Sequence, residues 1–158
     1  MAQPARQTVE TTDETVAFRS RRFGNYMVAA ERVVHFAEGL IGFPAARRFV
    51  LLEPECPDSP FRCLVCLDTP ELGFVVCEPR ALWPGYATDL PLPAAAEAGD
   101  VAVLAIVTVP VDPRQMTANL LAPLVIDSRT RSGQQVVLDT GRYSTRHPIL
   151  APAIPTHE

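Results

Sequence analysis

Apolar residues in this chain gather in short runs separated by prolines, glycines and charged residues. The longest run covers residues 101–109, is rich in β-branched residues and ends before Asp112-Pro113, a pattern typical of a strand buried on both faces. Similar shorter runs predict strands at residues 49–52, 61–67, 74–78, 116–126 and 134–138. This spacing favours an antiparallel sheet over a sheet with alternating helices.

Turn residues divide the rest of the chain. Gly24-Asn25 is a strong turn signal, so residues 16–23 and 26–36 are predicted to form a hairpin. Only two helical segments are predicted, one turn at residues 45–48 after Pro44 and a short helix at residues 92–98 before Gly99. With 16 prolines and 8 glycines, the chain is expected to be all-β, mainly antiparallel: a small β-barrel-like domain with one or two short helices.

The predicted strand at residues 116–126 contains Pro123 in its middle. Proline cannot donate a hydrogen bond to a strand ladder, so this strand is expected to lie at an edge or to carry a bulge. An edge with unpaired backbone groups is a place where another chain can dock.

The length of 158 residues suits one domain with its own core. We expect this domain at residues 16–150, a disordered N-terminal tail at residues 1–15 and a loose C-terminal tail at residues 151–158. With 47% hydrophobic and 20% charged residues, the composition is that of a globular protein. The first residues lack the apolar core of a signal peptide and no apolar run is long enough for a bilayer, so a cytoplasmic location without membrane contact is expected.

Charge is distributed unevenly along the chain. The formal net charge is −4, but residues 53–100 contain nine acidic and two basic residues, a balance of −7. This segment would repel nucleic acid and attract a basic partner, although a solvated acidic surface without a partner is an equally open interpretation. Arg19, Arg21 and Arg22 could form a phosphate-binding patch, but direct nucleic-acid binding is not expected from a net acidic chain.

Four cysteines and three histidines are candidates for metal binding or catalysis. Cys63 and Cys66 form a Cys-x-x-Cys pair, but in a strand residues three apart point to opposite faces, so joint chelation is disfavoured. None of the histidines stands in a metal-ligand or nucleophile motif. We therefore expect reduced thiols, no metal, no cofactor and no catalytic residue; the residues concerned are Cys56, Cys63, Cys66, Cys77, His35, His147 and His157.

The polar residues that remain indicate an interaction surface. The turn at residues 68–73 presents the carboxylates of Asp68 and Glu71 between two apolar strands, and Glu78 follows the second strand. Thr117 and Asn119 share one face of the predicted edge strand, beside the flexible side chain of Met116. An apolar strand with an acidic turn would suit an amphipathic basic segment. The alternative is that Thr117 and Asn119 satisfy local backbone groups.

Several segments resemble the FliW family of flagellar assembly factors, in the same order over about residues 18–150. They are EGLIGFPAARRFVLL, SPFRCLVCLDTPELGFVVCEP, VLAIVTVPVDPRQMTANLLAPLVIDSRTRSGQQVVL and YSTRHP. The block MTANLLAPLVI, together with the glutamine and the YSTRHP segment that follow it, is specific to the family. The glycine-containing segment EGLIGFPAARRFVLL alone would be weak evidence. This chain departs from the family at Cys63 and Cys66, so the resemblance assigns these cysteines no function.

The resemblance implies a non-enzymatic β-barrel that binds flagellin and the translational repressor CsrA by turns. Flagellin would occupy the protein until export, and the freed protein would then antagonise CsrA, which is competition by mass action. A monomer is expected, because a switch needs its docking edge free. The alternative, from another functional class, is a small metal-binding or enzymatic β-barrel that uses the cysteines and histidines. Metal analysis of the purified protein distinguishes this alternative from a partner-binding protein.

Overall fold

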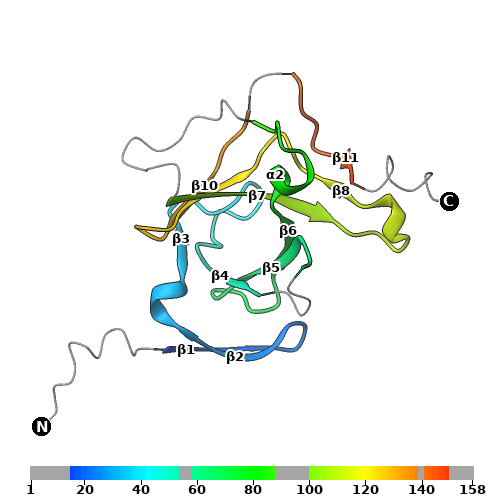
Figure 1. The fold of residues 1–158 in the computed structure, drawn as a ribbon. Helices are drawn as coiled ribbons and strands as arrows, with labels where there is room; N and C mark the ends of the chain where they lie inside the picture. The colour runs from blue at the N-terminus through cyan, green and yellow to red at the C-terminus, as the bar shows by residue number, and fades with distance from the viewer. Residues whose placement is uncertain (1–14, 54–57, 88–99, 139–140, 150–158) are drawn as a thin grey trace, which may run out of the picture.

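A computed structural model describes residues 15–53, 58–87, 100–138 and 141–149 (Figure 1). Within these residues the chain is mostly β, with one α-helix of four residues, α2 (Pro79–Leu82), and two 3₁₀ turns at Ala30–Arg32 and Pro113–Gln115. The prediction of an all-β, mainly antiparallel barrel with few helices is confirmed. The strands are β1 (Thr15–Ser20), β2 (Gly24–Ala29), β3 (Val34–Phe36), β4 (Arg48–Leu52), β5 (Phe61–Cys66), β6 (Gly73–Cys77), β7 (Val101–Thr108), β8 (Thr117–Ala118), β9 (Leu124–Asp127), β10 (Ser132–Gln135) and β11 (His147–Pro148).

One sheet closes on itself. Strands β7, β6, β5, β4, β3, β10 and β9 follow one another in hydrogen-bonded order, and β9 also pairs with β7, which completes a barrel. Neighbouring strands are antiparallel except β3 and β10, which run parallel. Strands β8 and β11 extend the sheet beyond β7. Closure pairs the backbone groups that an open sheet would leave free at its edges.

The strand β7 separates two hydrophobic cores, as its unbroken apolar sequence predicted. Leu104 and Ile106 face the barrel interior, whereas the alternating residues Val103, Ala105 and Val107 belong to a second core on the other side of the sheet. In the barrel interior the rings of Phe36 and Phe49 are fully buried and meet edge to face, with centroids 5.4 Å apart. The described members of the second core include Cys77, Tyr86, Ala118, Leu120, Val125, Leu138 and Ile149.

The β10 strand packs tightly on the barrel interior at Gly133. A Cβ atom at this position would lie 2.6 Å from Cζ of Phe36, closer than atoms can approach. The absence of a side chain at Gly133 therefore allows β10 to cross over the Phe36 ring beside β3.

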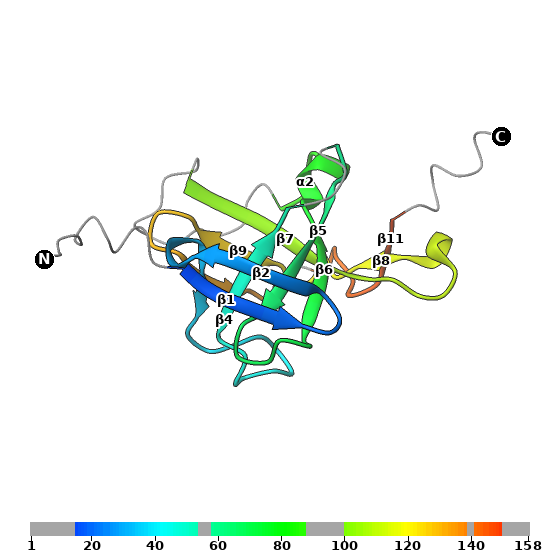
Figure 2. The ribbon, with the colours of Figure 1, turned by 90° about the horizontal axis from the view of Figure 1, so that it is seen from below.

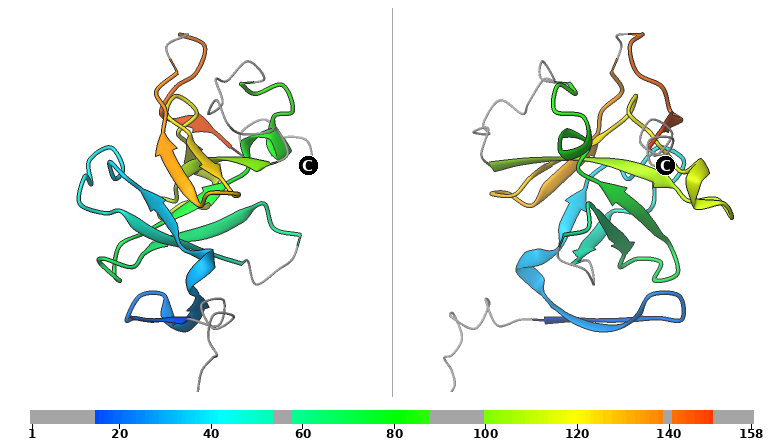
Figure 3. Two further views of the ribbon diagram at one scale, coloured as in Figure 1. Left: turned by 90° about the vertical axis from the view of Figure 1, so that its left-hand side faces the viewer. Right: turned by 45° about the vertical axis from the view of Figure 1, so that its right-hand side comes forward.

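The strands β1 and β2 form a separate hairpin that lies as a second layer outside the barrel wall (Figures 2 and 3). Its turn consists of Arg21, Arg22 and Phe23, and Gly24 pairs with Ser20 instead of occupying the turn that Gly24-Asn25 predicted. Gly24 still has a positive φ of 98°, which glycine adopts without strain. The predicted strand at residues 26–36 is divided by the 3₁₀ turn Ala30–Arg32, after which β3 enters the barrel.

The predicted strand at residues 116–126 is also divided. Residues 119–123 leave the ladder between β8 and β9, so the expected interruption at Pro123 is present. The expectation of an edge strand is wrong, because β8 lies between β7 and β11, and β9 lies between β10 and β7.

The helix predictions had a mixed outcome. Residues 45–48 form no helix. Arg48 already begins β4, and Ala46 donates its N–H to the carbonyl of Phe43 in a turn. The helix α2, which the sequence reading missed, begins at Pro79, where a missing N–H costs nothing. The helix predicted at residues 92–98 lies outside the described residues, as do both predicted tails apart from Thr15, which begins β1. No helix of the described residues is long and apolar enough to span a bilayer.

Candidate partner-binding surface

Asp68 joins the start of β4 to the end of β5. Its Oδ2 accepts the backbone N–H groups of Arg47 and Arg48 at 3.0 and 2.9 Å, and its Oδ1 accepts Nε of Arg48 at 3.0 Å. Partial burial raises the pKa of the Asp68 carboxyl, but the two N–H groups and the Arg48 guanidinium outweigh this effect and hold the pKa below its ordinary value. The carboxylate therefore has a structural function.

Glu71 attaches the β1–β2 hairpin to the turn between β5 and β6. Its carboxylate accepts the backbone N–H of Arg21 at 2.9 Å and that of Arg22 at 3.0 Å, and the hydroxyl of Ser20 at 3.3 Å. These hydrogen bonds, the one from Arg21 first, lower the pKa of the Glu71 carboxyl. Beside it, Phe23 lies against Gly73, where an added Cβ atom would meet the Phe23 ring at 2.5 Å. The acidic turn thus holds the hairpin in place.

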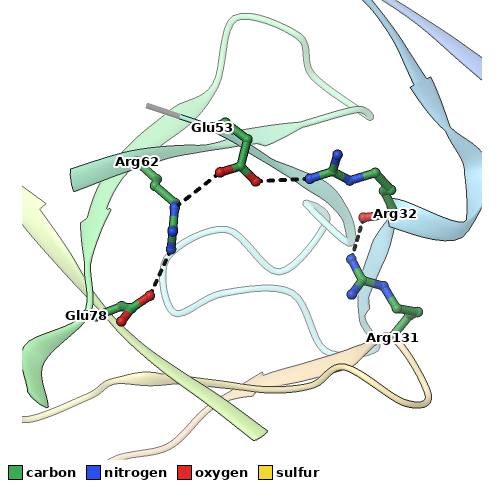
Figure 4. A network of polar contacts seen from close by, with 5 residues as sticks. All are labelled: Arg32, Glu53, Arg62, Glu78 and Arg131. Atoms are coloured by element: carbon green, nitrogen blue, oxygen red, sulfur yellow. Dashed lines mark hydrogen bonds and ion pairs between the residues drawn. The ribbon is translucent and has the colours of Figure 1, made fainter. Parts of the chain in front are cut away.

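Glu78 belongs to a chain of ion pairs that crosses one end of the barrel (Figure 4). Arg62 of β5 contacts Glu78 at 2.9 Å and Glu53 at 3.8 Å, and Glu53 contacts Arg32 at 3.2 Å. Arg131 continues the network by donating to the carbonyl of Arg32 at 2.7 Å. The side chains of Glu53 and Glu78 are 64% and 53% exposed, so both carboxylates remain accessible to a partner.

Asn119 stabilises the bend that follows β8. Its Oδ1 accepts the backbone N–H groups of Leu121 and Ala122 at 3.1 and 3.0 Å, which confirms for Asn119 the alternative of a local backbone role. Thr117 pairs with Thr108 of β7 on one side and with Pro148 of β11 on the other, so the backbone edge expected there is covered by the chain itself. The side chains of Met116, Thr117 and Asn119 are half-buried.

The predicted partner-binding residues occupy three places. Glu71 precedes β6 and Glu78 follows it, which separates them by roughly 20 Å at about 3.3 Å per residue. Met116, Thr117 and Asn119 lie on and beside β8, two strands across the sheet from β6. The structure therefore joins Asp68 and Glu71 in one turn, and places Glu78 and the β8 residues elsewhere.

An exposed apolar loop was missed by the sequence reading. Residues 109–116 connect β7 to β8 and extend beyond the barrel (Figure 2). Val111 is 103% exposed and Val109 is 50% exposed. Asp112 stiffens the loop, since its Oδ1 accepts the backbone N–H of Arg114 at 3.0 Å at the start of the 3₁₀ turn. The signal in the sequence was the pair of valines in VPVDP that continue the apolar pattern beyond the strand.

The cysteines are separated as the strand geometry predicted. Cys66 is fully buried in the barrel interior, whereas Cys63 is half-buried beneath the β1–β2 hairpin. Burial raises the pKa of all three described thiols, to about 11 for Cys77. The described residues contain no group of three or more histidine, cysteine or acidic residues that could hold a metal ion. Cys56 and His157 lie outside them.

Comparison with known proteins identifies the family. The family model of the FliW protein matches residues 17–149. The chain is 33% identical over 136 residues to the flagellar assembly factor FliW of Caldanaerobacter subterraneus subsp. tengcongensis, covering 83% of this chain and 91% of that protein. It is 39% identical over 133 residues to the flagellar assembly factor FliW of Geobacillus kaustophilus, covering 80% and 90%.

A solved structure agrees with the sequence comparisons. The crystal structure of a flagellar assembly factor FliW superposes with a TM-score of 0.76 at 34% identity, covering 85% of this chain and 96% of the other. Residues 17–149, which the family model matches, include the barrel, most of the β1–β2 hairpin and the β7–β8 loop. The chain therefore belongs to the FliW family of flagellar assembly factors.

Proposed function

We propose that this protein is a non-enzymatic, monomeric cytoplasmic regulator that binds flagellin and the translational repressor CsrA in turn. Membership of the flagellar assembly factor family over residues 17–149 is the observation that carries the proposal. Flagellin that has not been exported would occupy the protein. After export, the free protein would capture CsrA and relieve repression of flagellin synthesis, so that two ligands compete for one protein by mass action.

The β7–β8 loop and the adjoining β8 residues supply the apolar contact in this proposal. Val111 has no contact that shields it from water, and Met116 at the base of the loop offers a flexible thioether. Thr117 and Asn119 flank this apolar surface; the Nδ2 group of Asn119 has no partner among the described residues, because only its Oδ1 is used. An exposed apolar loop with polar neighbours is a common composition for a protein interface.

The acidic residues supply charge complementarity to CsrA. An RNA-binding protein presents basic surface, and the −7 balance of residues 53–100 would attract it and disfavour bound RNA. Among the three predicted carboxylates, Glu78 is the most available for a direct contact, since its side chain is 53% exposed and its described contact is with the Arg62 side chain. Asp68 and Glu71 contribute negative potential, but their oxygens already accept backbone N–H groups. No nucleic acid or membrane is required as a partner.

The substitution Val111→Glu tests the apolar contact. Because the side chain is fully exposed, the fold should be unchanged, while the affinity for flagellin measured by isothermal titration calorimetry should fall at least tenfold. Val137→Glu is the matched control, since Val137 is also exposed at 58% but lies outside the loop. Equal flagellin affinities for both variants and the unmodified protein would remove the loop from the proposal.

The substitution Glu78→Arg tests the electrostatic contact. Reversal of this charge should weaken CsrA binding at low salt, and the difference should shrink as salt screens the charges. Glu38→Arg, which reverses another exposed carboxylate, is the control. If neither flagellin nor CsrA is bound by the unmodified protein, the proposed function itself is wrong.

A further inference from the structure

A small aromatic groove lies beside the end of α2, at a surface that shares no residue with the β7–β8 loop. Its volume is about 330 Å³, enough for one or two side chains, and it contains the single tryptophan and two of the three tyrosines of the chain. Tryptophan and tyrosine dominate the energetically important positions of protein interfaces. The lining residues are Trp83, Pro84, Gly85, Tyr86, Leu120, Arg142, Tyr143 and His147.

The groove is held in one shape by hydrogen bonds. The Tyr86 hydroxyl donates to the buried carbonyl of Leu120 at 2.6 Å, and the Tyr143 hydroxyl accepts the N–H of Ala87 at 2.9 Å. Arg80 donates to the carbonyls of Tyr86 and Ala87 at 3.0 and 2.6 Å. The rings of Tyr86 and Tyr143 meet edge to face with centroids 4.7 Å apart. A preformed site loses little entropy when a ligand binds.

Backbone strain is located at the same place. Ala87 has a φ of 47°, in the left-handed region that costs a non-glycine residue roughly 1–2 kcal/mol. Two hydrogen bonds maintain this conformation: Arg80 donates to the Ala87 carbonyl, and the Ala87 N–H donates to the Tyr143 hydroxyl. Strained residues that their surroundings hold so firmly are concentrated at ligand-binding sites.

The side chains of the groove offer hydrogen-bond donors and positive charge. The indole Nε1–H of Trp83 and the hydroxyl proton of Tyr143 have no acceptor among the described residues, whereas both rings present apolar faces. Arg142 lies over the Tyr143 ring at 5.3 Å, and His147 meets the Trp83 ring edge to face at 4.8 Å. None of the lining residues that the structure describes carries a carboxylate. A complementary ligand is therefore apolar, rich in carbonyl oxygens and acidic.

We propose that this groove binds an extended, proline-containing segment of a partner protein that carries at least one carboxylate. Proline has no N–H, so a polyproline II segment exposes carbonyl acceptors for Trp83 and Tyr143 without leaving donors unpaired. Its rings pack on aromatic side chains, which is how aromatic-lined grooves recognise such segments. The carboxylate complements Arg142 and His147. This interaction is additional to the proposed binding of flagellin and CsrA, which uses the β7–β8 loop and the acidic residues.

Trp83 provides a direct measurement, because no other tryptophan contributes to the emission. The probe is a capped eight-residue peptide with two prolines three positions apart and two glutamates, added to the full chain. A saturable change of the Trp83 emission is expected. Replacement of both prolines by alanine, or of both glutamates by lysine, should weaken binding at least tenfold. An unaltered emission, or equal binding of the three peptides, overturns the proposal.

Protein variants locate the contact. Arg142→Glu should weaken binding of the glutamate peptide at least tenfold and should improve binding of the lysine peptide. Arg146→Glu, a reversal at an exposed arginine that does not line the groove, should leave the affinity within twofold. Equal effects of the two reversals overturn the assignment to this groove. A variant without residues 150–158, which contain Pro152 and Pro155, tests whether the chain fills the groove itself. If this deletion shifts the Trp83 emission and strengthens peptide binding, the occupant is the chain's own segment and the proposal of a separate partner is overturned.

Discussion

Glu71 and Arg22 are joined in both directions although they are 49 positions apart in the sequence. The carboxylate of Glu71 accepts the backbone N–H of Arg22 at 3.0 Å, and Nη1 of Arg22 donates to the backbone carbonyl of Glu71 at 3.4 Å. The turn of the β1–β2 hairpin is therefore bound to the turn between β5 and β6 through both backbone and side-chain atoms. Among the strands that the structure describes, the hairpin has no partner in the barrel sheet, so these bonds are central to its attachment.

The substitution Glu71→Ala is expected to release the hairpin while the barrel stays folded. The backbone N–H groups of Arg21 and Arg22 lose their acceptor, so their hydrogen exchange should accelerate at least tenfold. Cys63, which lies under the hairpin, should become more reactive toward a thiol reagent in a Cys56→Ser background. Glu38→Ala, at another exposed glutamate, should change neither measurement. Unchanged exchange at Arg21 and Arg22 would show that side-chain packing alone holds the hairpin.

Acid should weaken the contact between β4 and β5 through Asp68. Because the pKa of Asp68 is lower in the folded protein than its ordinary value of 3.8, the stabilisation is complete above that value and is lost as the pH falls through the folded pKa. Urea unfolding at pH 7 and at decreasing pH below 4 measures this loss. Asp68→Asn should be less stable at pH 7 and should lose less stability on acidification. An identical acid dependence in the variant would assign it to other carboxylates.

Gly133→Ala should destabilise the barrel by about 1–3 kcal/mol, since the new Cβ atom would overlap the Phe36 ring and Phe36 is fully buried. The free energy of unfolding from urea denaturation is the measurement. Gly85→Ala is the matched control, because an added Cβ atom at Gly85 meets nothing within 4 Å, and its effect should stay within about 0.5 kcal/mol. Equal stabilities of the two variants would show that the Phe36 ring can move aside.

Asn119→Ala should cost about 1–2 kcal/mol of unfolding free energy, because the N–H groups of Leu121 and Ala122 lose a shared acceptor in a partly buried bend. The control is Asn25→Ala, an exposed asparagine of β2, with an expected effect within about 0.5 kcal/mol. Thermal unfolding followed by circular dichroism separates the two. A neutral Asn119→Ala would mean that water replaces the amide oxygen in the bend.

Local patterns in the sequence were sufficient for the strand content and for several properties of single strands. Burial of β7 on both faces followed from its unbroken apolar run, and the separation of Cys63 from Cys66 followed from the alternation of side chains in a strand. The hairpin was found, but its turn was misplaced at Gly24-Asn25, because turn propensity is local whereas the register is fixed by Phe18 and Ser20 packing inward. The predicted partner-binding residues remain a proposal.

The sequence by itself determined an all-β domain, its approximate strands and the family to which the chain belongs. The strands and the family can be recognised because both depend on local patterns: the periodicity of side chains along a strand and short motifs of residues that are close in the sequence. Only the tertiary structure decided that β11 covers β8, that the Asp68 and Glu71 carboxylates bind backbone groups far away in sequence, and that Trp83 and Tyr143 line one groove. Such contacts join segments up to dozens of residues apart, and they form only when the chain as a whole buries its apolar surface.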